Sequence, residues 1–77
     1  MLSPLQCRLG RTALGLSVRR LAEKAGVAPS TVNRFETGRV EPSHATLVAL
    51  RKVMEDGGVA FRVDGGVTPP PGKEGGR

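Results

Sequence analysis

Apolar residues recur every three or four positions in four short stretches of the chain, and this spacing predicts four α-helices. The helices are expected over residues 3–14, 18–25, 29–37 and 44–56. Their expected inward-facing residues are Cys7, Gly10, Arg11 and Leu14; Val18, Leu21, Ala22 and Ala25; Val32 and Phe35; and Leu47, Leu50, Val53 and Met54. Short helices with brief connections predict an all-α fold, a compact bundle of four to five short helices.

Local signals support the ends of these helices. Ser3, Ser17 and Ser43 stand where N-caps are expected, and Gln6 lies three residues after Ser3, as in a capping box. Glycine follows the first three helices at positions 15, 26 and 38, and the fourth at 57. Gly10 inside the first helix disfavours helix formation, which predicts close packing against a neighbouring element.

The pattern changes after residue 57. Residues 59–63 alternate in the manner of a strand, residues 64–66 read as a turn, and residues 67–68 could begin a return strand. Three consecutive prolines then end any ladder. We therefore expect a helical domain over residues 1–57, a β-segment over 58–68 and a disordered Gly/Pro-rich tail over 69–77.

Composition narrows the function. The chain has 77 residues, one Cys and one His, which is room for one small domain without a disulfide or a Cys/His metal cluster. No set of nucleophile, base and orienting residue is visible, so we expect no enzyme activity, no cofactor and no metal. The sequence shows no signal peptide and no membrane-spanning apolar run, which favours a cytoplasmic protein with no membrane partner.

The net charge is confined to one half of the chain. Residues 1–39 hold seven basic and two acidic residues, whereas residues 40–77 hold five of each. This asymmetry favours a polyanionic partner for the first half, either nucleic acid or a membrane surface. A basic surface that only keeps the protein soluble is the alternative reading.

Residues 18–37 carry the most informative pattern. Two short helices meet at Gly26, because glycine readily adopts the left-handed backbone conformation that the turn between them requires. Ala22 is small enough to let the backbones of the two helices approach each other. The run LSVRRLAEKAGVAPSTVNRFETG over residues 16–38 resembles the helix-turn-helix of the lambda-repressor/Cro (Xre) family of regulators. The resemblance covers roughly residues 4–56.

The resemblance implies a role for each matching residue. The helix from Pro29 to Thr37 would enter the DNA major groove. Base contacts would come from Ser30, Thr31, Asn33 and Arg34; phosphate contacts from the Val18 amide, Arg19, Arg20, Thr37 and Arg39; and a structural ion pair from Arg11 and Glu36. This chain departs from the family by having Val18 in place of a phosphate-binding Gln, and Pro29 in place of a base-reading side chain.

The sequence thus indicates a double-stranded DNA-binding transcriptional regulator, and we expect a repressor. One alternative is an antitoxin that represses its own operon and binds a toxin partner; another is a helical protein-interaction module. Val59, Phe61 and Val63 are the candidate dimerisation residues, because the strand could pair with its copy in a homodimer. The strand could instead fold back on its own bundle.

Overall fold

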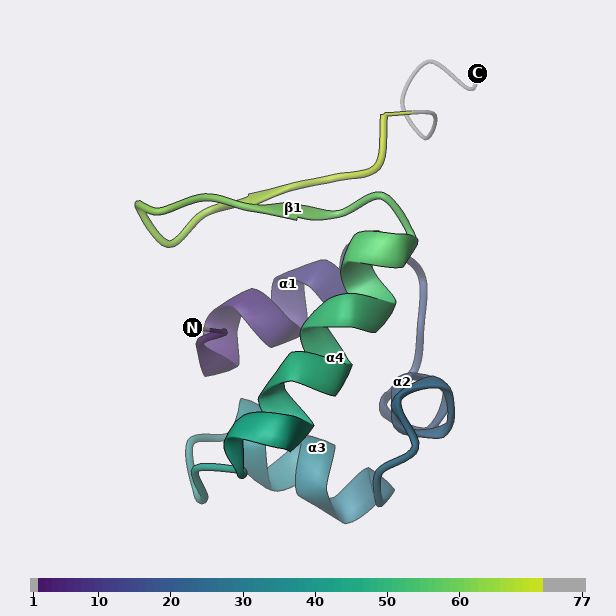
Figure 1. Cartoon of the computed structure of the whole chain (residues 1–77), viewed down its shortest axis with the longest axis vertical. Helices are drawn as coiled ribbons and strands as arrows, with labels where there is room; N and C mark the ends of the chain where they lie inside the picture. The colour runs from purple at the N-terminus through teal and green to yellow at the C-terminus, as the bar shows by residue number, and fades with distance from the viewer. Residues whose placement is uncertain (1, 72–77) are drawn as a thin grey trace.

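The computed structural model describes residues 2–71, which form four helices followed by a two-stranded antiparallel ribbon (Figure 1). The elements are α1 (Pro4–Ala13), α2 (Val18–Ala25), α3 (Pro29–Glu36), α4 (His44–Asp56), β1 (Ala60–Phe61) and β2 (Val67–Thr68). The predicted fold class, a helical bundle with a C-terminal hairpin, is confirmed. Helix α3 lies at one end of the molecule and the hairpin at the other, with α4 running between them (Figure 1).

The helix starts follow from their caps. Gln6 N–H donates to Ser3 Oγ at 3.0 Å, and Ser3 N–H donates to Gln6 Oε1 at 3.1 Å, which completes the expected capping box. Ser17 and Ser43 cap α2 and α4 in the same way through their hydroxyl oxygens. Gly26 ends α2 in the left-handed conformation, with φ of 73°, and so turns the chain toward α3.

The core lies between all four helices. Its fully buried members are Cys7, Leu21, Ala22, Val32, Leu50 and Met54. Ala22 and Val32 come from the two helices of the predicted helix-turn-helix, and Phe35 anchors α3 beside them. Ala22 has the small side chain that was expected at this close approach.

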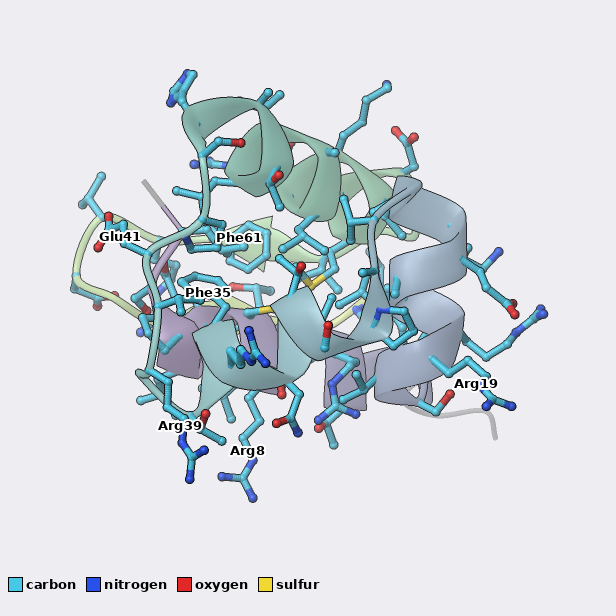
Figure 2. All side chains as sticks on the ribbon, turned by 90° about the horizontal axis from the view of Figure 1, so that it is seen from below. Arg8, Arg19, Phe35, Arg39, Glu41 and Phe61 are labelled. Carbon is cyan, nitrogen blue, oxygen red and sulfur yellow. The ribbon has the colours of Figure 1, made fainter. Side chains whose placement is uncertain are left out.

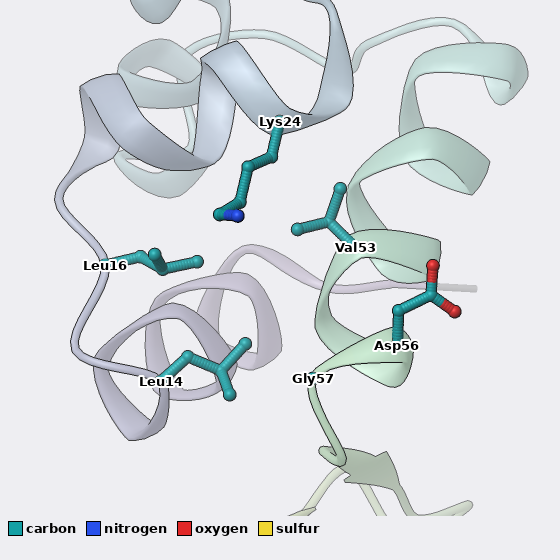
Figure 3. A pocket seen from close by; sticks show the side chains of 6 residues that line it. All are labelled: Leu14, Leu16, Lys24, Val53, Asp56 and Gly57. Atoms are coloured by element: carbon teal, nitrogen blue, oxygen red, sulfur yellow. The ribbon is translucent and has the colours of Figure 1, made fainter.

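Val53 lies at the edge of the core. It is only partly buried and lines an open groove of about 480 Å³ at the end of α4 that is away from α3 (Figure 3). Leu14, Leu16, Lys24, Asp56 and Gly57 complete the lining. The periodicity placed Val53 on the apolar face of its helix, where it packs against the core on one side and borders the groove on the other.

The hairpin folds back on its own bundle. Ala60 pairs with Thr68 and Phe61 with Val67 in an antiparallel register. The preceding residue, Val59, is 3 % exposed and belongs to the core. The structure therefore corresponds to the second alternative given above, in which the strand packs within its own chain, and it leaves Val63 as the fully exposed member of the three dimerisation candidates.

Two residues of α1, Gln6 and Gly10, contact the hairpin. The Gln6 side-chain amide donates to the carbonyls of Arg62 and Gly66, both at 3.5 Å. A Cβ atom built on Gly10 would lie 3.3 Å from Cζ of Phe61 and 2.7 Å from Sδ of Met54, so the predicted close packing at this glycine is confirmed. The guanidinium carbon of Arg51 in α4 lies 5.4 Å from the centroid of the Phe61 ring, within the range of a cation–π contact.

The disordered tail was predicted to begin at residue 69, but the structure describes the first three of its residues. Pro70 is buried and packs against Gly58, so residues 69–71 are part of the folded chain that the structure describes. Residues 72–77, the remainder of the predicted tail, lie outside the described residues.

No helix within residues 2–71 is long and apolar enough to cross a membrane.

Replacement of Gly10 by Val should destabilise the protein by about 1–3 kcal/mol, because the added methyl groups would overlap Met54 and the Phe61 ring. The free energy of unfolding, measured by urea denaturation followed by circular dichroism, checks this expectation. Thr12→Val is the matched control, since it places the same side chain at an exposed position of the same helix. Equal stability of the two variants would contradict the close packing of α1 on the hairpin and α4.

Candidate nucleic-acid interface

Ion pairs neutralise half of the basic side chains in the described part of the chain. Five pairs form, at distances of 2.9–3.5 Å: Arg11–Glu36, Arg20–Glu23, Arg51–Glu55, Lys52–Asp56 and Arg62–Asp64. Within residues 2–71, this leaves Arg8, Arg19, Lys24, Arg34 and Arg39 without a carboxylate partner. All five belong to the first three helices or to the residues just after α3, so the uncompensated charge lies in the helix-turn-helix half.

Three of these arginines extend along one side of the molecule. Arg8 from α1, Arg39 from the segment after α3, and Arg19 from α2 point outward around α3, whereas Glu41 lies apart from them (Figure 2). All three side chains are exposed. These three basic side chains therefore surround a helix whose own outer face is polar.

The outer face of α3 is formed by residues of the predicted base-contacting set. Ser30, Asn33 and Arg34 are exposed and Thr31 is half-buried, while Val32 and Phe35 point into the core. Arg34 has the planar, five-donor side chain that can bind guanine O6 and N7 together. The helix has no side-chain cap, because Ala28 stands at its N-cap position.

Thr37 uses its hydrogen-bond donors within the end of α3. Its hydroxyl is placed to donate to the carbonyls of Asn33 at 3.0 Å and Arg34 at 3.2 Å, and its N–H also donates to the Asn33 carbonyl. A phosphate oxygen only accepts hydrogen bonds. The predicted phosphate contact through Thr37 would therefore require the hydroxyl to leave these carbonyls.

The start of α2 presents both the backbone and side-chain groups expected to meet phosphate. Val18 is the first residue of the helix, where the N–H has no acceptor within its own helix, and its side chain packs on the core. Arg20 lies beside Glu23 at 3.2 Å, but both side chains are exposed and such pairs are weak. Arg20 could therefore exchange this carboxylate for a phosphate at little cost.

Arg11 and Glu36 lie together inside the molecule. Arg11 Nε donates to Glu36 Oε2 at 2.9 Å and Nη2 donates to Oε1 at 3.0 Å, which makes the pair bidentate. Arg11 Nη1 also donates to the carbonyl of Leu16 at 2.9 Å. The side chains are 17 % and 6 % exposed, so the pair joins α1, α3 and the connection before α2 beneath the surface.

The thiol of Cys7 completes this cluster by donating to Glu36 Oε2 at 3.3 Å. Burial raises the pKa of Cys7 above its ordinary value, and the negative charge of Glu36 raises it further. The hydrogen bond to Glu36 raises the pKa of Arg11. Cys7 is thus a protonated, buried side chain rather than a reactive thiolate.

Arg8 is an exposed basic residue on this side of the molecule that the sequence analysis did not indicate. It was not among the predicted contacts because it lies in α1, before the helix-turn-helix segment. One signal could have found it: Arg8 precedes Arg11 by three residues, so both lie on neighbouring parts of one helix face, and Arg11 was expected to meet α3.

A small cleft brings α1, α2 and α3 together on this side. It has a volume of about 230 Å³ and is lined by Arg8, Arg11, Val18, Asn33, Glu36 and Thr37. Within the described residues, no group of three His, Cys, Asp or Glu side chains is placed to hold a metal ion.

Comparison with known proteins points to the same segment. A protein-family model described as helix-turn-helix matches residues 8–55, which is more than half of the chain. No curated protein sequence matches the chain significantly.

Replacement of Arg11 by Ala should lower the free energy of unfolding by about 3 kcal/mol, because it leaves the buried Glu36 charge without its partner. In a domain of this size, the melting temperature should fall by more than about 10 °C. Lys52→Ala is the control, since it breaks an ion pair with both partners exposed and should change stability by less than about 1 kcal/mol. Similar melting curves for Arg11→Ala and the parent would show that the pair does not hold α1 to α3.

Proposed function

Since this chain belongs to the Xre/lambda-repressor-like helix-turn-helix family of DNA-binding regulators, we propose that it represses transcription by binding a specific double-stranded DNA sequence. The observation that carries the proposal is the exposed polar face of α3. It is bordered by arginines of three different segments that form no ion pair within residues 2–71. A regulator bound at a promoter would exclude the transcription machinery from the same stretch of DNA.

In the proposed complex, α3 lies in the major groove with its outer face toward the base edges. The groove is wide enough to admit one helix, and its base edges present a different pattern of donors and acceptors for each base pair. Arg34 would bind a guanine, and Ser30 and Asn33 would supply shorter polar contacts. Pro29 at the first position of α3 contributes no hydrogen-bond donor. The first residue of α3 that could contact a base directly would therefore be Ser30.

Phosphate contacts would fix the position of α3 in the groove. We assign them to the Val18 amide and Arg19 at the start of α2, to Arg20 after release from Glu23, and to Arg39 after α3. Such contacts give affinity and orientation without distinguishing one base from another. They also make affinity depend steeply on salt, because bound counterions are released from the DNA.

A homodimer on two half-sites stays a prediction. Because the hairpin packs on its own bundle, only its outer parts could contact a second copy. Val59 is buried and Phe61 packs on α1 and α4, so a second copy would meet the hairpin at an outer strand edge and at Val63. Half-sites bound by a two-fold dimer would appear as a palindrome in the selected DNA.

Selection of bound duplexes from a random pool at physiological salt tests the proposed function. Enrichment of one sequence, with a clear preference over competitor DNA, is the expected result. Binding with no sequence preference would contradict a sequence-specific regulator. An affinity for duplex DNA that does not change between low and high salt would contradict the phosphate contacts.

Replacement of Arg34 by Ala should relax the preference at one base position of the selected sequence, at a cost of about 1–3 kcal/mol. Titration of the variant against the selected duplex and its single-base substitutions measures this loss. Arg62→Ala is the control, because it removes one exposed positive charge from the hairpin, at the end of the molecule opposite α3. A uniform loss of affinity across all duplexes would instead make Arg34 a phosphate contact.

A further inference from the structure

We propose that Arg8 of α1 binds a backbone phosphate of the DNA, so that the interface includes the first helix as well as the helix-turn-helix. The inference rests on the proposed function, but it concerns a residue outside the helix-turn-helix segment.

The charge of Arg8 is not used within the described part of the protein. Its side chain is exposed and forms none of the ion pairs found within residues 2–71. An arginine with no internal partner is available for an external anion, and its guanidinium suits the geometry of a phosphate.

The cleft beside Arg8 has a net positive charge. Three charged residues line it, and two of them, Arg11 and Glu36, neutralise each other through a bidentate pair. Arg8 therefore supplies the remaining charge of the lining. Asn33, an exposed residue of α3, also lines this cleft and has an amide that can donate a hydrogen bond.

The placement of Arg8 favours a phosphate over a base. Arg8 extends from α1 on the same side of the molecule as Arg39, at the border of the α3 surface rather than from α3 itself (Figure 2). A helix in the major groove reaches the base edges, while residues at its border meet the strands that bound the groove. Arg8 and Arg39 are thus positioned as two border contacts that belong to different segments.

Arg8→Gln tests this assignment, because it removes the charge and keeps a flexible polar side chain, although a shorter one. The affinity for the selected duplex should fall about three- to tenfold at physiological salt, and it should fall by the same factor for an unrelated duplex. The slope of log affinity against log salt should become shallower by about 0.9, the value for one phosphate contact. Arg8→Lys, which keeps the charge, should recover most of the affinity.

Arg62→Gln is the matched control, since it also removes one exposed arginine charge but from the hairpin. If Arg8→Gln binds as the parent does, or loses no more than Arg62→Gln, the assignment to Arg8 is wrong. A loss restricted to one base position would also overturn it, because Arg8 would then read a base. Failure of the parent protein to bind DNA would refute the proposed function itself. Circular dichroism should show unchanged stability, because Arg8 has no carboxylate partner in the described chain.

Discussion

The position of α3 depends on the ion pair between Arg11 and Glu36. Arg11 is the last-turn basic residue of α1 and Glu36 is the final residue of α3, so the pair joins the first helix to the end of the helix that we propose enters the groove. Burying two charges costs solvation free energy that their attraction only partly returns. A pair of apolar residues could stabilise the protein as well, but it would not fix direction: two parallel N–H···O bonds and a third bond to Leu16 allow one orientation of the three segments.

Because Arg11 is paired inside the molecule, fewer basic residues are available to a binding partner than the sequence suggests. The sequence places seven basic residues in the first 39 positions, but one of them, Arg11, is neutralised inside the molecule and another, Arg20, has a carboxylate beside it. What remains for a partner is a small number of arginines around α3. In α4 and the hairpin, basic residues pair with nearby acidic ones at Arg51–Glu55, Lys52–Asp56 and Arg62–Asp64. Within residues 2–71, the basic residues without a carboxylate partner therefore all lie in the first three helices or just after α3, where electrostatic attraction would orient the protein before contact.

Local signals were sufficient to predict the helices and most of the core. Ser3, Ser17 and Ser43 cap the helices where the sequence placed them, and Gly26 adopts the left-handed turn, because each of these interactions involves residues at most three or four positions apart. Sequence reasoning failed where a residue depends on distant neighbours. Val53 has the right spacing for the core and packs against it, but it is only partly buried because it borders an open groove.

In the candidate site, too, features that depend on nearby residues could be predicted from the sequence, whereas those that depend on packing could not. The polar outer face of α3 follows from helical periodicity, so Ser30, Asn33 and Arg34 could be selected from sequence. The hydroxyl of Thr37 is directed to the carbonyls three and four residues before it, which is a local pattern typical of Thr, so the sequence could also have indicated it. The three-residue spacing from Arg11 places Arg8 on the same side of α1, but its position beside α3 became visible only in the tertiary structure, because it results from the packing of α1.

Helix α1 therefore connects the two ends of the molecule. Within ten residues it provides Gln6 and Gly10 to the hairpin, and Arg11 to α3. Gln6 and Gly10 are four positions apart and Arg11 follows Gly10, so with Cys7 they form the inner side of the helix, whereas Arg8 is exposed. A small domain has little apolar area with which to hold separate parts in place. One helix therefore holds both the hairpin and α3 in place, although the two lie at opposite ends of the bundle.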